Sequence, residues 1–222
     1  MAAERRRVGG VYAITPELAD TALLLAKSEA ALRGGAAWLQ YRCKLAAPDL
    51  RRAQAMALRQ LCARFGRPFI VNDDVDLAQA VAADGVHLGA EDGSIVAARG
   101  RLGPAAIIGA SCYDRLEAAE RAVADGADYV AFGSVFPSAV KPSAVRAPLT
   151  LFREAAARVP VPLVAIGGIT AANAASVISA GADAVAVISA IFDAPDVESA
   201  TRELAILFDS RRGIGAPRRQ TG

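Results

Sequence analysis

The sequence predicts a single-domain (β/α)₈ barrel. Its 222 residues are close to the roughly 250 that are typical of this fold. Short apolar runs alternate with helical segments eight times, an order that predicts a parallel sheet, and eight units predict closure into a barrel. Hydrophobic residues make up 54% of the chain and aromatic residues only 5%, so we expect a core of small and branched aliphatic side chains, as in strands buried on both faces.

The expected strands are apolar runs bounded by glycine, proline or charged residues. In chain order they occupy residues 10–14, 38–41, 69–71, 85–88, 107–110, 129–133, 163–166 and 184–188. An open doubly wound sheet is the alternative. The barrel is preferred because no GxGxxG motif follows the first strand.

Each expected strand is followed by an expected helix. The first helix starts at Thr15 as N-cap, has Pro16 in its first turn, and ends at Gly34. The others occupy residues 47–65, 75–82, 94–99, 115–124, 150–158, 171–179 and 197–207.

The segment from Gly133 to Lys141 is longer than ordinary βα loops of about 2–6 residues. We expect a lid that brings Lys141 to a phosphate, and a tolerated insertion is the alternative.

Three helix-to-strand junctions carry similar glycine–aspartate sequences. They contain Asp84 before Gly85, Asp128 after Gly126, and Asp183 after Gly181. Glycine ends a helix in a left-handed conformation and aspartate supports the turn that follows. We therefore expect these aspartates to be structural and to lie at the barrel end opposite the functional site.

Composition limits the possible partners and location. A net charge of +2 is too small to indicate a nucleic-acid partner. The three cysteines, Cys43, Cys62 and Cys112, fit neither a zinc motif nor a disulfide framework, and they favour a reducing compartment. With no apolar signal or membrane-spanning segment, we expect a cytoplasmic protein with no membrane partner. We expect a flexible N-terminus at residues 1–8, the barrel at 9–210 and a disordered basic tail at 211–222; the choice between monomer and homo-oligomer stays open.

Two carboxylates follow neighbouring expected strands. Asp73 ends the third strand and Asp92 follows the fourth. Because adjacent strands lie about 4.8 Å apart, these carboxylates could share one Mg²⁺ together with substrate phosphate. Helix capping is the alternative, and it suits Asp74 and Asp76 better.

Cations follow the second expected strand. Gln40, Arg42 and Lys44 share one parity, so they point the same way if the strand geometry continues. Arginine offers a planar fork for phosphate and lysine a point charge. A solvent-exposed loop is the alternative, but it leaves Gln40 unexplained inside an apolar strand.

A second phosphate signal lies after strands seven and eight. Gly167-Gly168 and Ile188-Ser189 stand where many barrels bind phosphate through backbone N–H groups. His87, the single histidine, lies in mid-strand and is expected to be a buried, hydrogen-bonded structural residue rather than a base. Cys43 and Cys112 have no evident base nearby and are expected to be non-nucleophilic.

These motifs together resemble the thiamine-phosphate synthase family over nearly the whole chain, from about residue 11 to 208. The matching motifs, in order, are Gln40-x-Arg42-x-Lys44, Asn72-Asp73, Asp84 to Asp92, Gly109-Ala110-Ser111, Gly133 to Lys141, Ile166 to Ile169, and Val187 to Ile191. The resemblance implies that hydroxymethylpyrimidine diphosphate joins thiazole phosphate to give thiamine phosphate and pyrophosphate, through a pyrimidine cation.

The resemblance also implies the role of each residue. Asp73 and Asp92 would bind Mg²⁺. The diphosphate would be held by Arg42, Lys44, Asn72 and Lys141. Gln40 and Ser111 would contact the pyrimidine, and the thiazole phosphate would be held by Ser138, Gly168, Ile188 and Ser189. Lys141, Arg42 and Ser111 form the expected catalytic set.

The chain departs from the commonest family pattern at Cys43, Ala90, Ser138 and Val140, and Val140 lacks a hydroxyl that could bind phosphate. Two alternatives stay open. One is a thiazole tautomerase-like paralogue, which tends to lose the cation and aspartate set and has a histidine where this chain has Cys112-Tyr113. The other is a non-catalytic barrel that binds a thiamine precursor.

Overall fold

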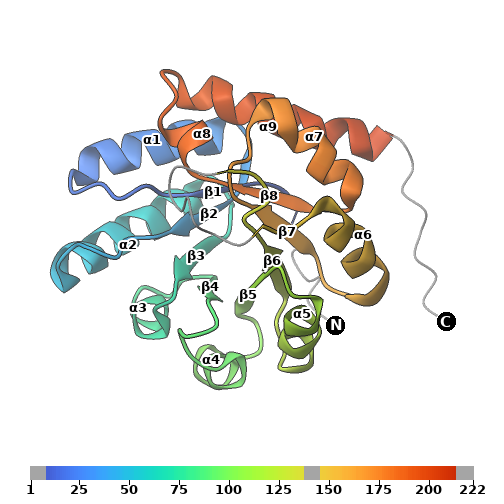
Figure 1. Cartoon of the computed structure of the whole chain (residues 1–222). Coiled ribbons are helices and arrows are strands. Elements are labelled where there is room, and N and C mark those ends of the chain that lie inside the picture. Colours follow the sequence, from blue (N-terminus) through green and yellow to red (C-terminus); the bar gives the residue numbers. More distant parts are fainter. Residues whose placement is uncertain (1–8, 138–145, 214–222) are drawn as a thin grey trace.

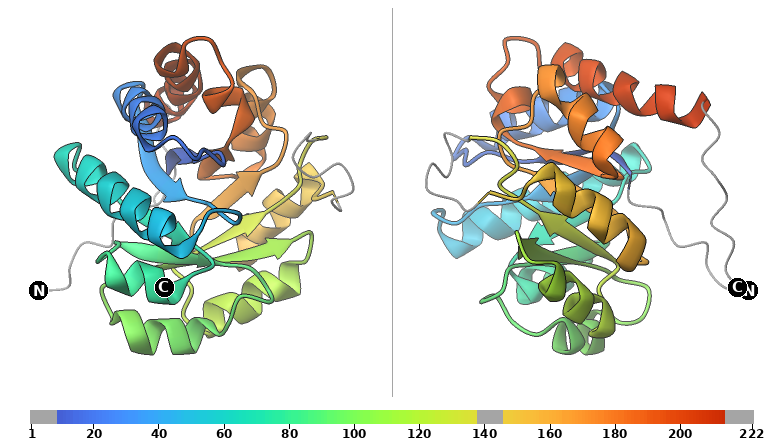
Figure 2. Two further views of the ribbon diagram at one scale, coloured as in Figure 1. Left: turned by 90° about the vertical axis from the view of Figure 1, so that its left-hand side faces the viewer. Right: turned by 45° about the vertical axis from the view of Figure 1, so that its right-hand side comes forward.

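The computed structural model describes residues 9–137 and 146–213, with side chains up to residue 209. Its eight strands are all parallel and close into a barrel in sequence order, β1 to β8 (Figure 1). The helices surround the strands (Figure 2). The structure thus confirms the predicted (β/α)₈ barrel.

The strands are β1 Gly10–Ile14, β2 Ala36–Tyr41, β3 Phe69–Asn72, β4 Gly85–Leu88, β5 Ile107–Tyr113, β6 Tyr129–Phe132, β7 Leu163–Ile166 and β8 Ala184–Val187. The helices are α1 Thr21–Arg33, α2 Pro48–Arg64, α3 Val75–Ala80, α4 Ile95–Leu102, α5 Leu116–Ala124, α6 Leu149–Arg158, α7 Ala171–Ala180, α8 Ser189–Phe192 and α9 Val197–Gly213.

The expected start of the first helix was wrong. Helix α1 begins at Thr21, and its N-cap is Asp20, whose carboxylate accepts from the backbone N–H groups of Ala22 and Leu23 at 2.8 and 3.1 Å. Thr15 instead prolongs the contact between β1 and β2: its N–H donates to Gln40 O at 2.9 Å, and its hydroxyl accepts from Arg42 N at 3.0 Å. The Thr15 hydroxyl, which the local sequence predicted to cap the first helix, thus makes a tertiary contact instead.

Two further differences lie near the C-terminus. The short helix α8 follows β8 directly and was not expected. Helix α9 runs to Gly213, so it includes the first three residues of the segment expected to be a disordered tail. Residues 214–222 and 1–8 lie outside the described part of the chain.

The apolar core has two layers. One cluster fills the space between the strands and the surrounding helices, and it includes Leu39, Val71 and Phe152. The second fills the barrel interior and consists of Tyr12, Ile14, Trp38, Ile70, Tyr129, Ala131, Val164, Ala184 and Ala186. Side chains that alternate along each strand therefore reach either the helix layer or the interior.

The three junction aspartates tie strand starts together. Oδ2 of Asp84, Asp128 and Asp183 accepts from the backbone N–H of Phe69, Ile108 and Leu163, at 2.8, 2.8 and 2.9 Å. Each aspartate precedes an even-numbered strand and holds the odd-numbered strand before it. The structural role expected for them is confirmed.

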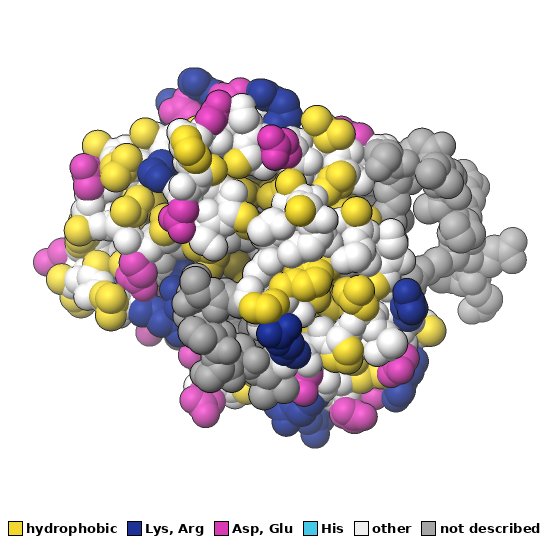
Figure 3. Space-filling model, turned by 45° about the horizontal axis from the view of Figure 1, so that its top comes forward, with side chains coloured by type: hydrophobic (Ala, Val, Ile, Leu, Met, Phe, Trp, Pro, Cys, Tyr) yellow, Lys and Arg dark blue, Asp and Glu magenta, His cyan; other side chains and the backbone are white. Residues whose placement is uncertain are grey.

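The surface carries mixed charge. Acidic and basic side chains are scattered among apolar ones on the face drawn in Figure 3, which accords with the net charge of +2. Within the described residues, no helix combines the length and apolar character needed to cross a membrane.

Candidate active site

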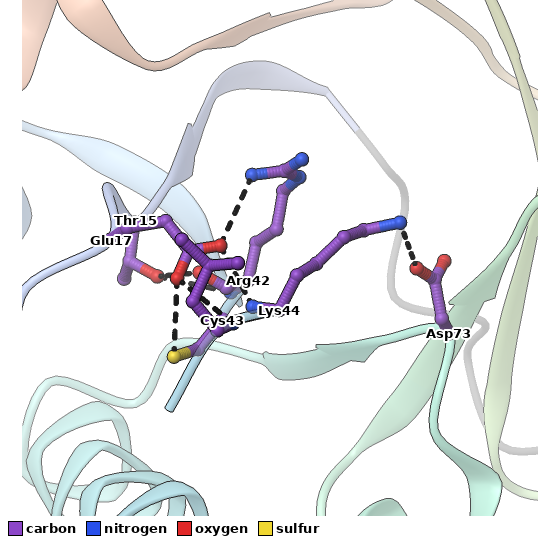
Figure 4. A network of polar contacts seen from close by, with 7 residues as sticks. Thr15, Glu17, Arg42, Cys43, Lys44 and Asp73 are labelled. Atoms are coloured by element: carbon purple, nitrogen blue, oxygen red, sulfur yellow. Dashed lines mark hydrogen bonds and ion pairs between the residues drawn. The ribbon is translucent and has the colours of Figure 1, made fainter. Parts of the chain in front are cut away.

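Lys44, in the loop after β2, meets Asp73, which follows β3, at the carboxyl ends of the strands (Figure 4). Lys44 Nζ lies 2.9 Å from Asp73 Oδ2, and both side chains retain contact with solvent. A positive and a negative group are thus brought together from loops 29 residues apart in sequence, as the barrel topology predicted.

Glu17, in the segment between β1 and α1, holds the loop that carries Arg42 and Lys44. Its carboxylate accepts from the backbone N–H of Lys44 at 2.7 Å and of Leu45 at 3.4 Å, and it lies 3.8 Å from Arg42 Nη1. Partial burial opposes ionisation, but the Lys44, Cys43 and Leu45 hydrogen bonds and the Arg42 charge together lower the pKa of Glu17. Sequence reasoning missed Glu17, because the helix expected to begin at Thr15 placed this residue in a first helical turn, whereas it lies in the loop after β1.

The expected metal carboxylates, Asp73 and Asp92, lie beside one another. Asp73 has a φ of 64°, a left-handed conformation that aspartate tolerates better than most residues, and its N–H donates to His87 O at 2.8 Å. Asp92 Oδ2 accepts from Gly89 N at 2.9 Å. Burial, then the neighbouring Asp73 carboxyl, raises the pKa of Asp92. A carboxyl whose ionisation is opposed by a neighbouring carboxyl favours a cation between the two.

A cavity of about 510 Å³ opens beside this pair, lined in part by Arg51, Asp73, Asp74 and Asp92. Asp74 caps α3, because its Oδ1 accepts from Leu77 N at 2.8 Å, which confirms the capping alternative for that residue. No cluster of three or more histidine, cysteine or acidic side chains suited to a metal occurs within the described residues.

Polar side chains continue from this site into the barrel interior. Gln40 Nε2 donates to the Tyr12 hydroxyl at 2.9 Å, and the Tyr12 and Tyr129 hydroxyls lie 2.8 Å apart. Tyr129 contacts His87 Nδ1 at 2.9 Å, and His87 Nε2 lies 2.9 Å from Ser111 Oγ. Two expected substrate contacts, Gln40 and Ser111, are therefore the ends of one buried hydrogen-bonded chain.

Burial fixes the protonation states along this chain. It lowers the pKa of His87 to about 4, against the opposing Asp92 charge, so the imidazole is neutral at pH 7. Burial also raises the pKa of Tyr12 and of Tyr129, so both keep their protons. The expectation of a buried, hydrogen-bonded His87 is confirmed.

The ends of β7 and β8 carry the second group of expected substrate contacts. Gly167 and Gly168 have φ values of 103° and 61°, and a Cβ on them would lie 2.1 Å from Ser134 Oγ and 2.2 Å from Pro137 O. Glycine is therefore required here for the approach of the loop after β6, whatever ligand binds. Ile188 packs against the interior cluster, and Ser189 begins α8.

The remaining expected residues divide by position. Asn72 ends β3 and is half-buried beside Asp73. Ser138 and Lys141, with Val140, lie outside the described residues, so the expected lid and its lysine stay predictions.

Cys43, Cys62 and Cys112 are free and buried, and burial raises the pKa of the Cys112 thiol to about 12. A thiol with such a pKa is a poor nucleophile.

Comparison with known proteins gives consistent results. The family model described as "Thiamine monophosphate synthase" matches residues 11–191. The chain is 58% identical over 200 residues to the thiamine-phosphate synthase of Thiobacillus denitrificans, covering 90% of this chain and 95% of that protein. It is 57% identical over 205 residues to that of Chromobacterium violaceum, covering 92% and 99%.

Solved structures agree with the sequence comparison. Thiamine phosphate pyrophosphorylase from Pyrococcus furiosus matches with a TM-score of 0.82 and 41% identity, over 92% of this chain and 98% of that one. Orotidine 5'-phosphate decarboxylase from Pyrococcus horikoshii matches with a TM-score of 0.66 but 15% identity, over 91% and 99%, which shows a shared fold alone.

Proposed function

The chain belongs to the thiamine monophosphate synthase family, and we propose that it joins 4-amino-2-methyl-5-hydroxymethylpyrimidine diphosphate to thiazole phosphate, forming thiamine phosphate and releasing pyrophosphate. Membership of this family makes the protein a transferase. The observation that best supports these substrates is the Lys44–Asp73 ion pair, with Asp92 beside Asp73, at the end of the barrel that also carries Arg42.

Cations from the second strand bind the leaving diphosphate in this proposal. Arg42 and Lys44 bind its oxygens, Asn72 donates from the end of β3, and Lys141 reaches it from the loop after β6. The Lys44–Asp73 ion pair keeps the lysine at the site before substrate arrives. When the diphosphate binds, its oxygens contact the Lys44 ammonium in place of Asp73 or together with it. A cation fixed at this position stabilises the negative charge that develops as pyrophosphate departs.

Asp73 and Asp92 would hold one Mg²⁺. Their donor chemistry fits, because Mg²⁺ takes one or two carboxylates together with water and substrate phosphate, and because burial and then the neighbouring Asp73 carboxyl raise the pKa of Asp92. When bound, the ion would neutralise part of the diphosphate charge.

Carbon–oxygen cleavage precedes carbon–nitrogen bond formation in the proposed mechanism. Pyrophosphate leaves with the bonding electrons, and the resulting pyrimidine-methyl cation is captured by the thiazole nitrogen. Gln40 and Ser111 orient the pyrimidine. Ser138, Gly168, Ile188 and Ser189 bind the thiazole phosphate, where the start of α8 provides the short extra helix common at barrel phosphate sites. No protein nucleophile is required, which suits the buried thiols.

The tautomerase-like alternative is not favoured. The chain keeps Arg42, Lys44, Asp73 and Asp92, and its relatives at more than half identity are synthases. The non-catalytic barrel is tested with the same assay as the synthase. We also propose a cytoplasmic location, which the free cysteines support.

Pyrophosphate release with both substrates and Mg²⁺ tests the proposal. We expect wild-type release to need both substrates and the metal, and Asp92→Asn to lower kcat/KM about 100-fold and weaken the apparent affinity for Mg²⁺. Asp76→Asn is the matched control, since Asp76 is exposed and pairs with Arg101 on α4. No release from wild type would exclude the synthase, and unchanged Mg²⁺ dependence in Asp92→Asn would exclude the metal assignment.

A further inference from the structure

The buried chain from Gln40 to Ser111 includes residues with no role in the proposed reaction. Tyr12 on β1, Tyr129 on β6 and His87 on β4 connect Gln40 on β2 with Ser111 on β5, through contacts of 2.8–2.9 Å. The exposed fractions of Tyr12 and Tyr129 are 1% and 0%. Buried hydroxyls need partners, so each must be satisfied within the chain.

The orientation of the Gln40 amide gives the hydrogen-bonded chain one direction of donation. Gln40 Nε2 donates to the Tyr12 oxygen, and within the described residues the Tyr12 hydroxyl has Gln40 and Tyr129 as its partners. The Tyr12 proton therefore goes to Tyr129, and the Tyr129 proton goes to His87 Nδ1. A neutral imidazole that accepts at Nδ1 carries its proton on Nε2, which donates to Ser111 Oγ.

This direction determines what a ligand meets at each end. Because the Gln40 amide nitrogen is turned to Tyr12, its carbonyl oxygen is presented as an acceptor. Because Ser111 Oγ accepts from His87, its own proton is available as a donor. We propose that the Tyr12–Tyr129 hydroxyl pair, acting through His87, is a positioning device that fixes Gln40 as acceptor and Ser111 as donor.

The ligand class rests on the proposed function. An aminopyrimidine carries an amino donor and ring-nitrogen acceptors, which complement a fixed acceptor and a fixed donor. A hydroxypyrimidine in which oxygen replaces the amino group places an acceptor against the Gln40 carbonyl. Such a mismatch leaves buried polar groups unpaired, which is the strong form of substrate discrimination.

The barrel interior is built to hold Tyr129 in this position. Gly109 pairs with Tyr129 across β5 and β6, and a Cβ on Gly109 would lie 2.0 Å from Tyr129 Cζ. The absence of that side chain leaves room for the ring to cross toward β4. There the ring stacks on His87, with centroids 5.5 Å apart and planes 22° apart. Tyr12 meets it edge-on at 5.9 Å.

The opposite direction makes a distinct prediction. If the Gln40 amide were rotated, Tyr12 would donate to its carbonyl, Tyr129 would donate to Tyr12, and His87 would carry its proton on Nδ1. The tautomer of His87 therefore reports the direction of the whole chain.

Nitrogen NMR measures this tautomer directly. His87 is the only histidine in the sequence, so untagged full-length protein labelled with ¹⁵N-histidine gives signals from one imidazole. We expect a protonated Nε2 and an unprotonated Nδ1 in wild type, and a shifted Nδ1 signal with mixed tautomers in Tyr129→Phe. A protonated Nδ1 in wild type would overturn the proposal.

Steady-state kinetics test the positioning role. Tyr12→Phe and Tyr129→Phe should each raise KM for the pyrimidine diphosphate roughly five- to tenfold, with a smaller effect on kcat. Either change also reduces the preference for the amino over the hydroxy substrate. The double variant should be no worse than the more impaired single one, because both changes break one chain. Unchanged KM, or fully additive losses, would overturn the proposal.

Tyr41→Phe is the matched control for both experiments. Tyr41 is equally buried and donates to Gln54 Oε1 at 2.8 Å, but it faces the helix layer. We expect it to keep the wild-type tautomer and KM, whatever its thermal stability. If wild type releases no pyrophosphate, the proposed function fails while the NMR result still decides the direction of the chain.

Discussion

At the scale of single residues, the Glu17 carboxylate determines where two cations lie. It accepts from the backbone of Lys44 and Leu45 and lies beside Arg42, and these contacts lower its pKa. Its contacts are with the backbone of the loop after β2 and with the Arg42 guanidinium. Its effect on catalysis should therefore come through the placement of Arg42 and Lys44.

Replacement of Glu17 should weaken diphosphate binding. Glu17→Ala leaves the Lys44 N–H without its acceptor and frees the loop, so we expect KM for the pyrimidine diphosphate to rise about tenfold, while Glu17→Gln keeps one acceptor and has a smaller effect. Steady-state kinetics measure both. Glu29→Ala is the control, because Glu29 pairs with Arg33 on the surface of α1. Identical kinetics for Glu17→Ala and Glu29→Ala would contradict the role of Glu17.

At the scale of elements, burial explains which boundaries the sequence could predict. Strands β4 and β7 begin and end where expected, because continuous apolar runs bounded by Gly, Asp or Pro leave little choice of register. The start of α1 was wrong because Thr15 bonds to Arg42, 27 positions away. Helix α8 has four residues, too few to show a helical period.

The candidate site could likewise be predicted only where local sequence determines position. Charges at strand ends could be predicted, because parallel strands bring their carboxyl ends to one face of the barrel. Glu17 and the interior tyrosines could not, because they act through contacts between distant segments: Tyr12 and Tyr129 are 117 positions apart. Polar residues in apolar strands, Gln40 and His87, were the sequence signals of the interior chain.

The junction aspartates should contribute to stability without affecting catalysis. Asp183→Ala removes the acceptor of Leu163 N at the start of β7, so we expect a loss of about 1–3 kcal/mol in the free energy of unfolding with kcat and KM unchanged. Asp183→Asn keeps an acceptor oxygen and should lose less. Denaturant unfolding and steady-state kinetics measure the two effects. A lowered kcat in folded Asp183→Ala would contradict the separation.

At the scale of the whole molecule, the two ends of the barrel have different roles, one structural and one in the proposed reaction. Aspartates at the amino ends of the strands accept from backbone N–H groups of neighbouring strands and link β3 to β4, β5 to β6 and β7 to β8. At the carboxyl ends, Lys44 pairs with Asp73, which the proposed reaction needs, and Arg42 lies beside Glu17. Ligand binding should therefore stabilise the protein through groups that contribute little to its core.

Inorganic pyrophosphate with Mg²⁺ tests this division of the molecule. A ligand at about 100 times its Kd stabilises the folded state by about 2.7 kcal/mol, which raises Tm by roughly 5–10 °C for a chain of this size. We expect wild type to show that shift with both ligands together and a smaller one with either alone, measured by thermal unfolding.

Variants at the two ends of the barrel should respond in opposite ways. Asp183→Ala should unfold at a lower temperature yet keep the full ligand shift, because the anion site is intact. Lys44→Ala should start near the wild-type Tm, since Lys44 is half-exposed, yet lose most of the shift because the cation that meets the phosphate is gone. A full shift in Lys44→Ala would show that pyrophosphate binds elsewhere. A lost shift in Asp183→Ala would show that the two ends of the barrel are not independent.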